Sequence, residues 1–299
     1  MAQSRWARDW PLHAMVWTGL AFVLVFSYGP MVGVVIAFQK FLPAHGLFGS
    51  NWIGFDNFRH IAEMPDTGRV IMNTVYIALM KMVAGLAAPI VVALLLNEIV
   101  VKSFKRSVQT IIYLPHFLSW VILAGILRDV LSPNFGIIND MIASIGFPRV
   151  FFLGDERWFP FVLVITDVWK EFGFGTIVFL AALTGINPVL YEAAVIDGAS
   201  RWKQTLHVTL PGIVPIVILM GTLSLGNVLN AGFDQVFNMY NTAVYSTGDI
   251  LDTYIYRLGL YNFEFGVATA VGLFKSAVSF VMISVSYMLA YRFANYRIF

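Results

Sequence analysis

Charged side chains within long apolar stretches are the residues of this sequence with the clearest capacity for chemistry. One stretch combines a lysine with two carboxylates, and the full set is Lys81, Lys170, Lys275, Asp167 and Glu171. A charged side chain in hydrocarbon is costly, so it faces a polar interior, pairs with another charge, or marks the path of a transported solute. Each lysine lies about 15–18 Å along its stretch, which is near the middle of a bilayer.

Two interpretations of the lysines remain open. They can line a shared polar cavity and attract an anionic solute. Alternatively, each can pair within the protein, and Asp167 and Lys170 lie three residues apart on one helix face, where they can form such a pair. Acid–base catalysis by Asp167 and Glu171 is disfavoured, because no nucleophile or metal cluster accompanies them.

Several other kinds of site are excluded by the sequence itself. Cysteine is absent, and the five histidines show no spacing typical of a metal site. No segment has the GxxxxGK[ST] pattern that cradles nucleotide phosphates, so ATP must be hydrolysed by another polypeptide if it is used at all. A formal net charge of +2, without the extended basic face that nucleic-acid binding needs, argues against a nucleic-acid partner. The chain is therefore predicted to be neither an enzyme nor the holder of a cofactor.

The elements that position these residues are predicted to be transmembrane helices. Hydrophobic residues make up 59% of the chain and charged residues 12%, against about 25% charged residues in a soluble domain. A crossing needs about 20 apolar residues, and backbone groups in lipid must pair within a helix. The sequence thus predicts an all-α membrane protein, a single transmembrane domain over residues 1–299. The expected spans are 14–38, 70–97, 108–127, 158–183, 210–229 and 265–291.

The orientation follows from the positions of lysine and arginine in the connections. The tightest cluster is Lys102, Lys105 and Arg106, in the short connection between the second and third spans. Short basic connections stay in the cytoplasm. Both termini are therefore predicted to be cytoplasmic, as is the connection between the fourth and fifth spans.

That last connection, residues 184–211, carries the strongest local signals in the chain. Asn187 suits an N-cap and Pro188 the first helical position, whereas Gly198 suits the left-handed position that ends a helix. Ser200 can cap a second short stretch. The signals predict a helix of about ten residues, which is too short to cross a membrane and lies on the cytoplasmic surface.

The same connection resembles the EAA loop of binding-protein-dependent ABC importer permeases. The matching residues are Glu192-Ala193-Ala194, then Gly198, then residues 208–211, where Val208 replaces the usual isoleucine. In that family the loop forms a coupling helix that docks in a groove of the cytoplasmic ATPase and transmits its ATP-driven closure. The resemblance implies this role for Glu192, Ala193, Ala194, Asp197 and Gly198.

The resemblance extends over most of the chain and is closest to the polysaccharide-permease branch of the carbohydrate-uptake importers. Further matching segments are residues 53–58, 97–98, 113–115, 169–170, 233–235 and 253–257. It implies the type I importer fold with six transmembrane helices, in a bacterial inner membrane. It also implies a second, similar permease, two ATPase subunits that use ATP and Mg²⁺, and an extracytoplasmic solute-binding protein. The alternative is a secondary transporter driven by an ion gradient, but the inverted repeats and broken helices typical of that class are not evident.

For a sugar or oligosaccharide, including an acidic one, the sequence offers seven candidates along the pathway. Aromatic rings can stack on a sugar, amides can bind its hydroxyl groups, and lysines can attract its carboxylates. The candidates are Lys81, Asp167, Trp169, Lys170, Asn227, Asn230 and Lys275. The amides can equally join helices to one another, and aromatic residues, 15% of the chain, also face lipid.

Overall fold

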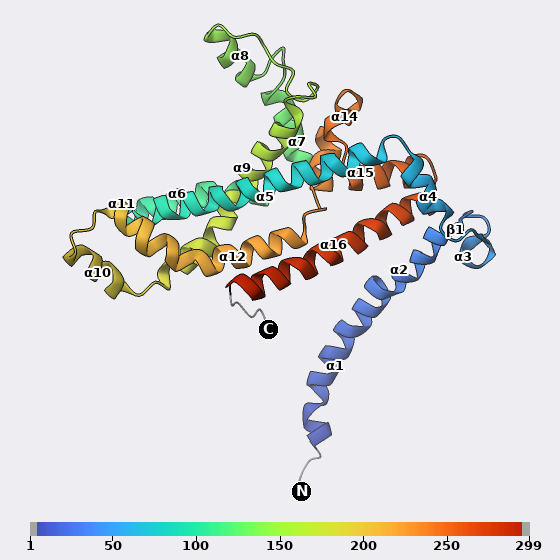
Figure 1. Cartoon of the computed structure of the whole chain (residues 1–299), viewed down its shortest axis with the longest axis horizontal. Coiled ribbons are helices and arrows are strands. Elements are labelled where there is room, and N and C mark those ends of the chain that lie inside the picture. The colour runs from blue at the N-terminus through green and yellow to red at the C-terminus, as the bar shows by residue number, and fades with distance from the viewer. Residues whose placement is uncertain (1–4, 295–299) are drawn as a thin grey trace. The chain divides into compact units, whose positions relative to one another are not determined.

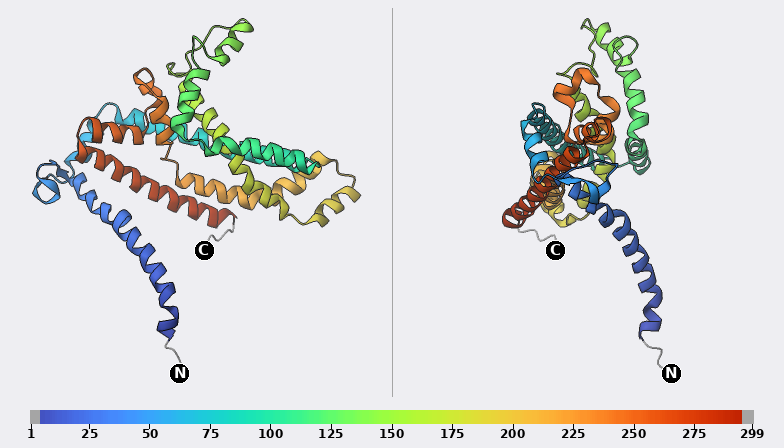
Figure 2. Two further views of the ribbon diagram at one scale, coloured as in Figure 1. Left: turned by 180° about the vertical axis from the view of Figure 1, so that it is seen from behind. Right: turned by 90° about the vertical axis from the view of Figure 1, so that its right-hand side faces the viewer.

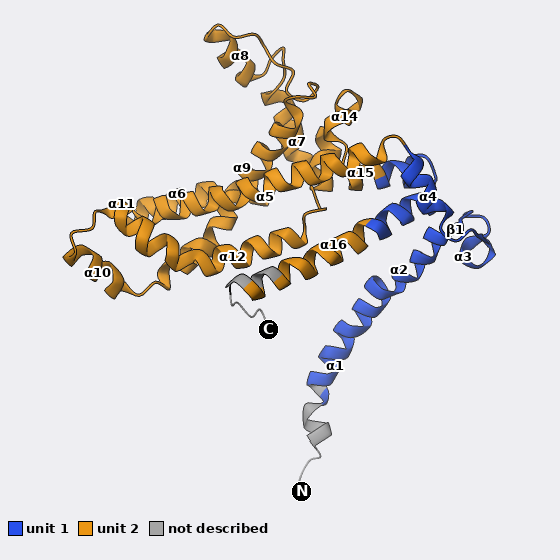
Figure 3. Ribbon diagram, in the orientation of Figure 1, with its two compact units in different colours: residues 1–64, 255–274 blue, residues 65–254, 275–299 orange. Residues whose placement is uncertain are grey.

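The computed structural model describes residues 5–294, so the two ends of the predicted domain lie outside the described residues. The chain is almost entirely helical, and its only strands are β1 (Gln39–Lys40) and β2 (Asn51–Trp52) within the described part (Figure 1). It divides into two compact units, residues 1–64 with 255–274 and residues 65–254 with 275–299 (Figure 3).

The first unit is built on a long N-terminal helix. The helix α1 (Arg5–Val23) continues through a π turn η1 (Leu24–Tyr28), α2 (Gly29–Met31) and the 3₁₀ segment η2 (Val32–Phe38). The strands β1 and β2 pair antiparallel around α3 (Gly46–Gly49), and α4 (Asp56–Glu63) follows. Asn57 of α4 donates to the carbonyls of Ala37 and Gln39, at 2.8 and 3.0 Å. This buried amide satisfies carbonyls that the end of the long helix leaves open.

The second unit is organised around two long helices, α5 (Thr67–Asn97) and α9 (Phe159–Thr184), which pack against one another. Pro89 lies inside α5 and faces Gly175 of α9, where an added Cβ would lie 3.1 Å from the proline ring. A proline interrupts helix hydrogen bonding, and a small facing residue allows the neighbouring helix to approach. Thr176 adds a contact of 3.5 Å to the carbonyl of Pro89.

The remaining helices of this unit are shorter. They are α6 (Lys102–Tyr113), η3 (Leu114–Phe117), α7 (Trp120–Val130), α8 (Ile137–Ser144), α10 (Pro188–Ile196), α11 (Arg201–Gln204), η4 (Thr205–Thr209), α12 (Leu210–Gly226), α13 (Phe233–Met239), η5 (Thr242–Val244) and α14 (Tyr245–Gly248). Two elements continue from one unit into the other: α15 (Leu251–Tyr256), which leads into η6 (Arg257–Tyr261), and α16 (Phe265–Ala294). A core cluster of Ala93, Phe179, Leu183 and Ile213 joins α5, α9 and α12.

Four helical segments of the described chain are long and apolar enough to cross a membrane: residues 12–38, 67–97, 201–226 and 265–288. Two bent pairs meet the same criterion together, so the number of crossings lies between four and six. Residues 12–38, 67–97 and 265–288 overlap the segments predicted as the first, second and sixth spans, α9 overlaps the fourth, and α12 overlaps the fifth.

The predicted third span, residues 108–127, is not one straight helix. Lys102–Phe117 and Trp120–Val130 meet at an angle of 102°. Pro115 lacks a backbone N–H, Leu118 and Ser119 are extended, and the Ser119 hydroxyl caps α7 by accepting from the Ile122 amide at 3.4 Å. The apolar run continues through the bend, which is why hydropathy alone predicts a single span.

Residues 131–158 form what we call the outer lobe, with α8 at the far end of α7 (Figures 1 and 2). Its centre is Asn139, which is fully buried. The Asn139 amide nitrogen donates to the carbonyls of Leu131, Ser132 and Val150, and its oxygen accepts from the Val150 amide at 2.7 Å. One side chain thus closes a loop that has little apolar core of its own.

Candidate functional site

The predicted coupling helix is present as α10, and its ends are capped as the sequence predicts. The Asn187 side chain accepts from the Val189 amide at 3.0 Å, and Pro188 is the first helical residue. At the other end, the Gly198 amide donates to the Val195 carbonyl, and the Ala199 amide donates to the Ala194 carbonyl. Gly198 itself has φ +72°. This pair of hydrogen bonds is the Schellman motif, which requires a left-handed residue. The helix is therefore rigidly defined at both ends.

The helix α10 is strongly apolar, yet none of its residues is buried. Val189, Leu190, Val195 and Ile196 are 59%, 51%, 62% and 86% exposed. The predicted coupling residues Glu192, Ala193, Asp197 and Gly198 are also exposed, and Ala194 is half-buried. Several exposed large apolar side chains on one short helix are typical of a protein–protein contact.

Two contacts join α10 and the segment after it to other helices of the second unit. The Tyr191 hydroxyl and the Thr209 hydroxyl are 3.0 Å apart, which ties α10 to the start of α12. Arg201 of α11 pairs with Glu98 at the end of α5, with 2.7 Å between their charged atoms. α10 is therefore joined directly to the start of α12, and the segment after α10 is joined to the end of α5.

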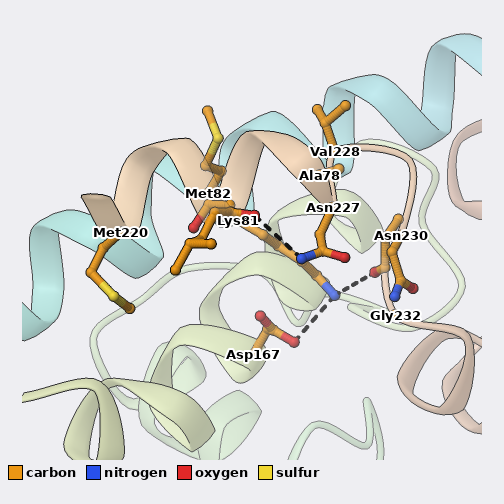
Figure 4. Close-up of a pocket in the computed structure, with 12 residues that line it drawn as sticks. Ala78, Lys81, Met82, Asp167, Met220, Asn227, Val228, Asn230 and Gly232 are labelled. Atoms are coloured by element: carbon orange, nitrogen blue, oxygen red, sulfur yellow. Dashed lines mark hydrogen bonds and ion pairs between the residues drawn. The ribbon is translucent and has the colours of Figure 1, made fainter. Parts of the chain in front are cut away.

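A cavity of about 320 Å³ lies between α5, α9, α12 and the loop that follows α12 (Figure 4). Its polar groups are Lys81, Asp167, Ser224, Asn227 and Asn230, and its apolar walls include Met82, Met220 and Leu223. Four of the seven predicted pathway residues, which are Lys81, Asp167, Asn227 and Asn230, are thus brought together.

Lys81 is nearly buried, at 9% exposure, and its ammonium group has three acceptors. It donates to the Ala231 carbonyl at 2.7 Å, to the side-chain oxygen of Gln235, and to Asp167 at 3.3 Å. Gln235 is fully buried and donates in turn to the Leu163 carbonyl and the Thr166 hydroxyl, both at 2.8 Å. The ammonium group and the amide together fasten α5, α9 and α13 to one another.

The remaining three predicted pathway residues lie outside this cavity. Lys170 is buried and donates to the His116 carbonyl at 2.9 Å and to Glu171 at 2.7 Å. Lys275 forms an ion pair with Asp252 of α15. Trp169 lines a separate apolar groove between α7 and α9. The predicted pair of Asp167 and Lys170 does not form, because Asp167 pairs with Lys81 of the neighbouring helix instead.

The sequence did not predict two residues that hold these groups. Gln235 supports Lys81, and it lies in the segment 233–235 that matched the family without a role being assigned. His116 stacks on Phe174, with ring centroids 4.1 Å apart, and its Nδ1 lies 2.7 Å from Glu171. Its position after Pro115, where helix carbonyls become free, was the available signal.

Comparison with known proteins defines the class of this chain. Residues 85–295 match the family of binding-protein-dependent transport system inner membrane components. The chain belongs to this family, and it is a membrane-embedded permease of an ABC importer, a non-catalytic transport component.

Individual relatives are similar along nearly the whole chain. Protein LplB of Bacillus subtilis is 40% identical over 98% of this chain and 92% of its own length. The polygalacturonan/rhamnogalacturonan transport system permease protein YteP of the same organism is 38% identical, over 96% and 90%. A bacterial ABC transporter involved in the import of the acidic polysaccharide alginate has a chain 39% identical, with a TM-score of 0.89 over 96% of this chain and 97% of that chain. A second structure of an alginate transporter, in complex with an alginate pentasaccharide-bound periplasmic protein, gives a TM-score of 0.88, with 38% identity over 97% and 98% of the two chains.

Proposed function

We propose that this chain forms half of the translocation pathway of an ATP-driven importer of saccharide chains, and that the solute passes the cavity containing Asp167. The single observation that carries this proposal is an exposed, apolar, doubly capped helix that is tied, together with the segment after it, to two helices bordering that cavity. The transported polysaccharides named for the similar proteins give the substrate class. No observation favours a transporter driven by an ion gradient.

The proposed complex contains further subunits, which supply nucleotide binding and contact the exposed surface of α10. A second, similar permease supplies the other half of the pathway, and two cytoplasmic ATPase subunits bind ATP and Mg²⁺. One of the ATPases docks on α10, whose exposed Val195 and Ile196 enter a groove of that subunit. A solute-binding protein delivers the saccharide from the outside. In this arrangement both termini are cytoplasmic, in the inner membrane, and six helices cross it.

Docking by α10 is carried by Glu192, Ala193, Ala194, Asp197 and Gly198. The Schellman end makes α10 a rigid lever, because Gly198 lies at φ +72° and tolerates only residues that accept a left-handed backbone. Small side chains at Ala193 and Ala194 allow close approach of a partner. A floppy loop would absorb the movement that a rigid helix transmits.

The proposal is tested first by purifying the tagged chain from its native membrane in mild detergent. We expect an ABC ATPase and a second permease to copurify, and the reconstituted complex to hydrolyse ATP faster with saccharide-loaded binding protein. Recovery of the chain alone, active in vesicles without ATP, would contradict the proposal.

Two matched variants test the lever separately. Gly198→Pro cannot adopt φ +72° and should abolish stimulated ATPase activity and weaken ATPase copurification. Gly198→Asn tolerates the left-handed conformation and should retain both. Equal behaviour of the two variants would remove α10 from the coupling role.

A further inference from the structure

The cavity in Figure 4 is lined by a positive side chain, Lys81, and a negative one, Asp167, which differ in how much of each is exposed. Lys81 is 9% exposed, whereas the side chain of Asp167 is 26% exposed. An ammonium group has three protons to donate, and those of Lys81 have three acceptors: the Ala231 carbonyl, Gln235 and Asp167. Any new acceptor must therefore displace one that is already bound.

Two of these acceptors are buried protein groups that direct the Lys81 ammonium group away from the open part of the cavity. Ala231 and Gln235 belong to the segment that follows α12, and both are essentially buried. The loop passes so close that a Cβ at Gly232 would lie 3.0 Å from the Lys81 nitrogen. Without the ammonium group, the Gln235 oxygen would lose its partner in a buried site, which is costly. The geometry makes Lys81 a fastening for the loop.

Asp167 has the opposite character. In the described part of the chain its only polar side-chain contact is the 3.3 Å contact from Lys81, so most of its acceptor capacity remains available. Figure 4 shows its carboxylate pointing toward Lys81, with Asn227 and Asn230 beyond. Both amide side chains are exposed, and that of Asn230 forms no hydrogen bond within the described residues. The cavity therefore offers a carboxylate and two amides to a solute.

We propose that Asp167, rather than Lys81, meets the solute here, by accepting hydrogen bonds from saccharide hydroxyl groups. Lys81 is a positioning residue that offsets the charge of Asp167 and holds the loop bearing Asn230. The assignment rests on the proposed function, because it requires a saccharide in this cavity.

The chemistry of the two groups supports the assignment. A carboxylate accepts at both oxygens and suits a pair of neighbouring hydroxyl groups, and hydrogen bonds to charged groups are the stronger ones. A carboxylate of the solute would instead meet Asp167 as a like charge in a poorly screened site. The cavity thus selects the uncharged, hydroxyl-bearing edge of the chain, and the carboxylates of an acidic saccharide lie elsewhere in the pathway.

Equilibrium binding to the complete permease–ATPase complex tests this assignment. The solute-binding protein is left out, because its own affinity would otherwise set the half-saturating concentration. The probes are oligogalacturonate, an alginate oligosaccharide and a neutral galacto-oligosaccharide, each measured by calorimetry. Asp167→Asn should raise the dissociation constant of whichever probe binds about 10- to 100-fold, while Asp66→Asn, the same change at an exposed outer position, should have no effect.

The sign of the effect decides between the interpretations. A lower dissociation constant for the uronate probes in Asp167→Asn would mean that a solute carboxylate faces Asp167, which overturns the assignment, as would an unchanged constant. If Asp167→Asn is poorly folded, Asn230→Ala provides the second test, because it removes an exposed amide that has no hydrogen-bond partner among the described residues and should also weaken binding. A wild-type complex that binds no probe would overturn both this assignment and the proposed function.

The role of Lys81 has its own readout. Lys81→Met and Gln235→Leu should lower the melting temperature of the complex alike, because both break the same fastening. A Lys81→Met complex with wild-type melting temperature but much weaker binding of the uronate probes would assign the solute contact to Lys81 instead.

Discussion

Gly173 gives the sharpest test of how the broken third span is held. A Cβ at this position of α9 would lie 1.9 Å from the Ile112 carbonyl oxygen and 2.5 Å from its carbon. Those atoms are backbone, so no side-chain rotation relieves the clash. Ordinary contact begins at 3.4 Å, so Gly173→Ala must separate α6 from α9 by about 1.5 Å, the difference between 3.4 and 1.9 Å.

The cost of Gly173→Ala to the free energy of unfolding has two parts, the overpacking itself and the hydrogen bonds that it disrupts. Overpacking of a tight site costs about 1–3 kcal/mol. The same shift stretches the contacts of His116 with Lys170 (2.9 Å) and Glu171 (2.7 Å) out of hydrogen-bond range. Loss of a hydrogen bond to a charged group adds about 1.5–3 kcal/mol. With one such bond lost, the total is about 2.5–6 kcal/mol, which corresponds to a fall of about 5–24 °C in melting temperature.

The assay is thermal unfolding of the detergent-purified complex, followed by fluorescence-detected size exclusion. Gly125→Ala in α7 is the matched control, since an added Cβ there meets nothing within 4 Å, and alanine is slightly favoured over glycine in a helix. If Gly173→Ala unfolds within 2 °C of the wild type, then α6 does not pack on α9 as closely as described, and the reasoning fails.

Three further variants are tested by melting temperature, ATPase activity or limited proteolysis. Glu98→Gln breaks only an exposed ion pair with Arg201, so it should lower the free energy of unfolding by less than about 1 kcal/mol. If stimulated ATPase activity nevertheless falls strongly, the pair transmits the movement of α10. Unaltered activity would show that Glu98 has no part in transmission. Asn139→Ala should make the outer lobe sensitive to limited proteolysis, because three carbonyls and one amide lose their partner; persistent resistance would show that the lobe is held by other contacts. Lys275→Met leaves the partly buried Asp252 without its cation and should lower the free energy of unfolding by about 3–5 kcal/mol. The added change Asp252→Asn should restore part of that stability. If it restores none, the lysine contributes by packing and not by its charge.

Local chemistry made much of the fold predictable. The ends of α10 are defined by the residues that cap it, Asn187, Pro188 and Gly198, and all three act as predicted. Long apolar runs likewise predict the helices because a membrane leaves no other partner for the backbone. The 102° bend was not predicted from the apolar pattern, because the apolar run continues unchanged through Pro115 and Ser119, where the bend occurs.

Contacts between helices were not predictable in the same way. Sequence spacing shows that Asp167 and Lys170 share a helix face, but Lys81, 86 residues from Asp167, lies closer in the folded chain. The packing of α5 against α9 decides this, and Pro89 and Gly175 are in close contact within that packing. The partners of the charged residues therefore follow from packing, which the order of residues alone does not give.

The bend between η3 and α7 has a consequence for the biogenesis of the chain. The segment Lys102–Phe117 spans about 24 Å as a helix, which is less than the roughly 30 Å of hydrocarbon that an autonomous insertion signal must match. The free carbonyl at its end is met by Lys170, which emerges from the ribosome more than 50 residues later. We expect this crossing to wait within the insertion machinery until α9 arrives, so that the two enter the lipid as one unit.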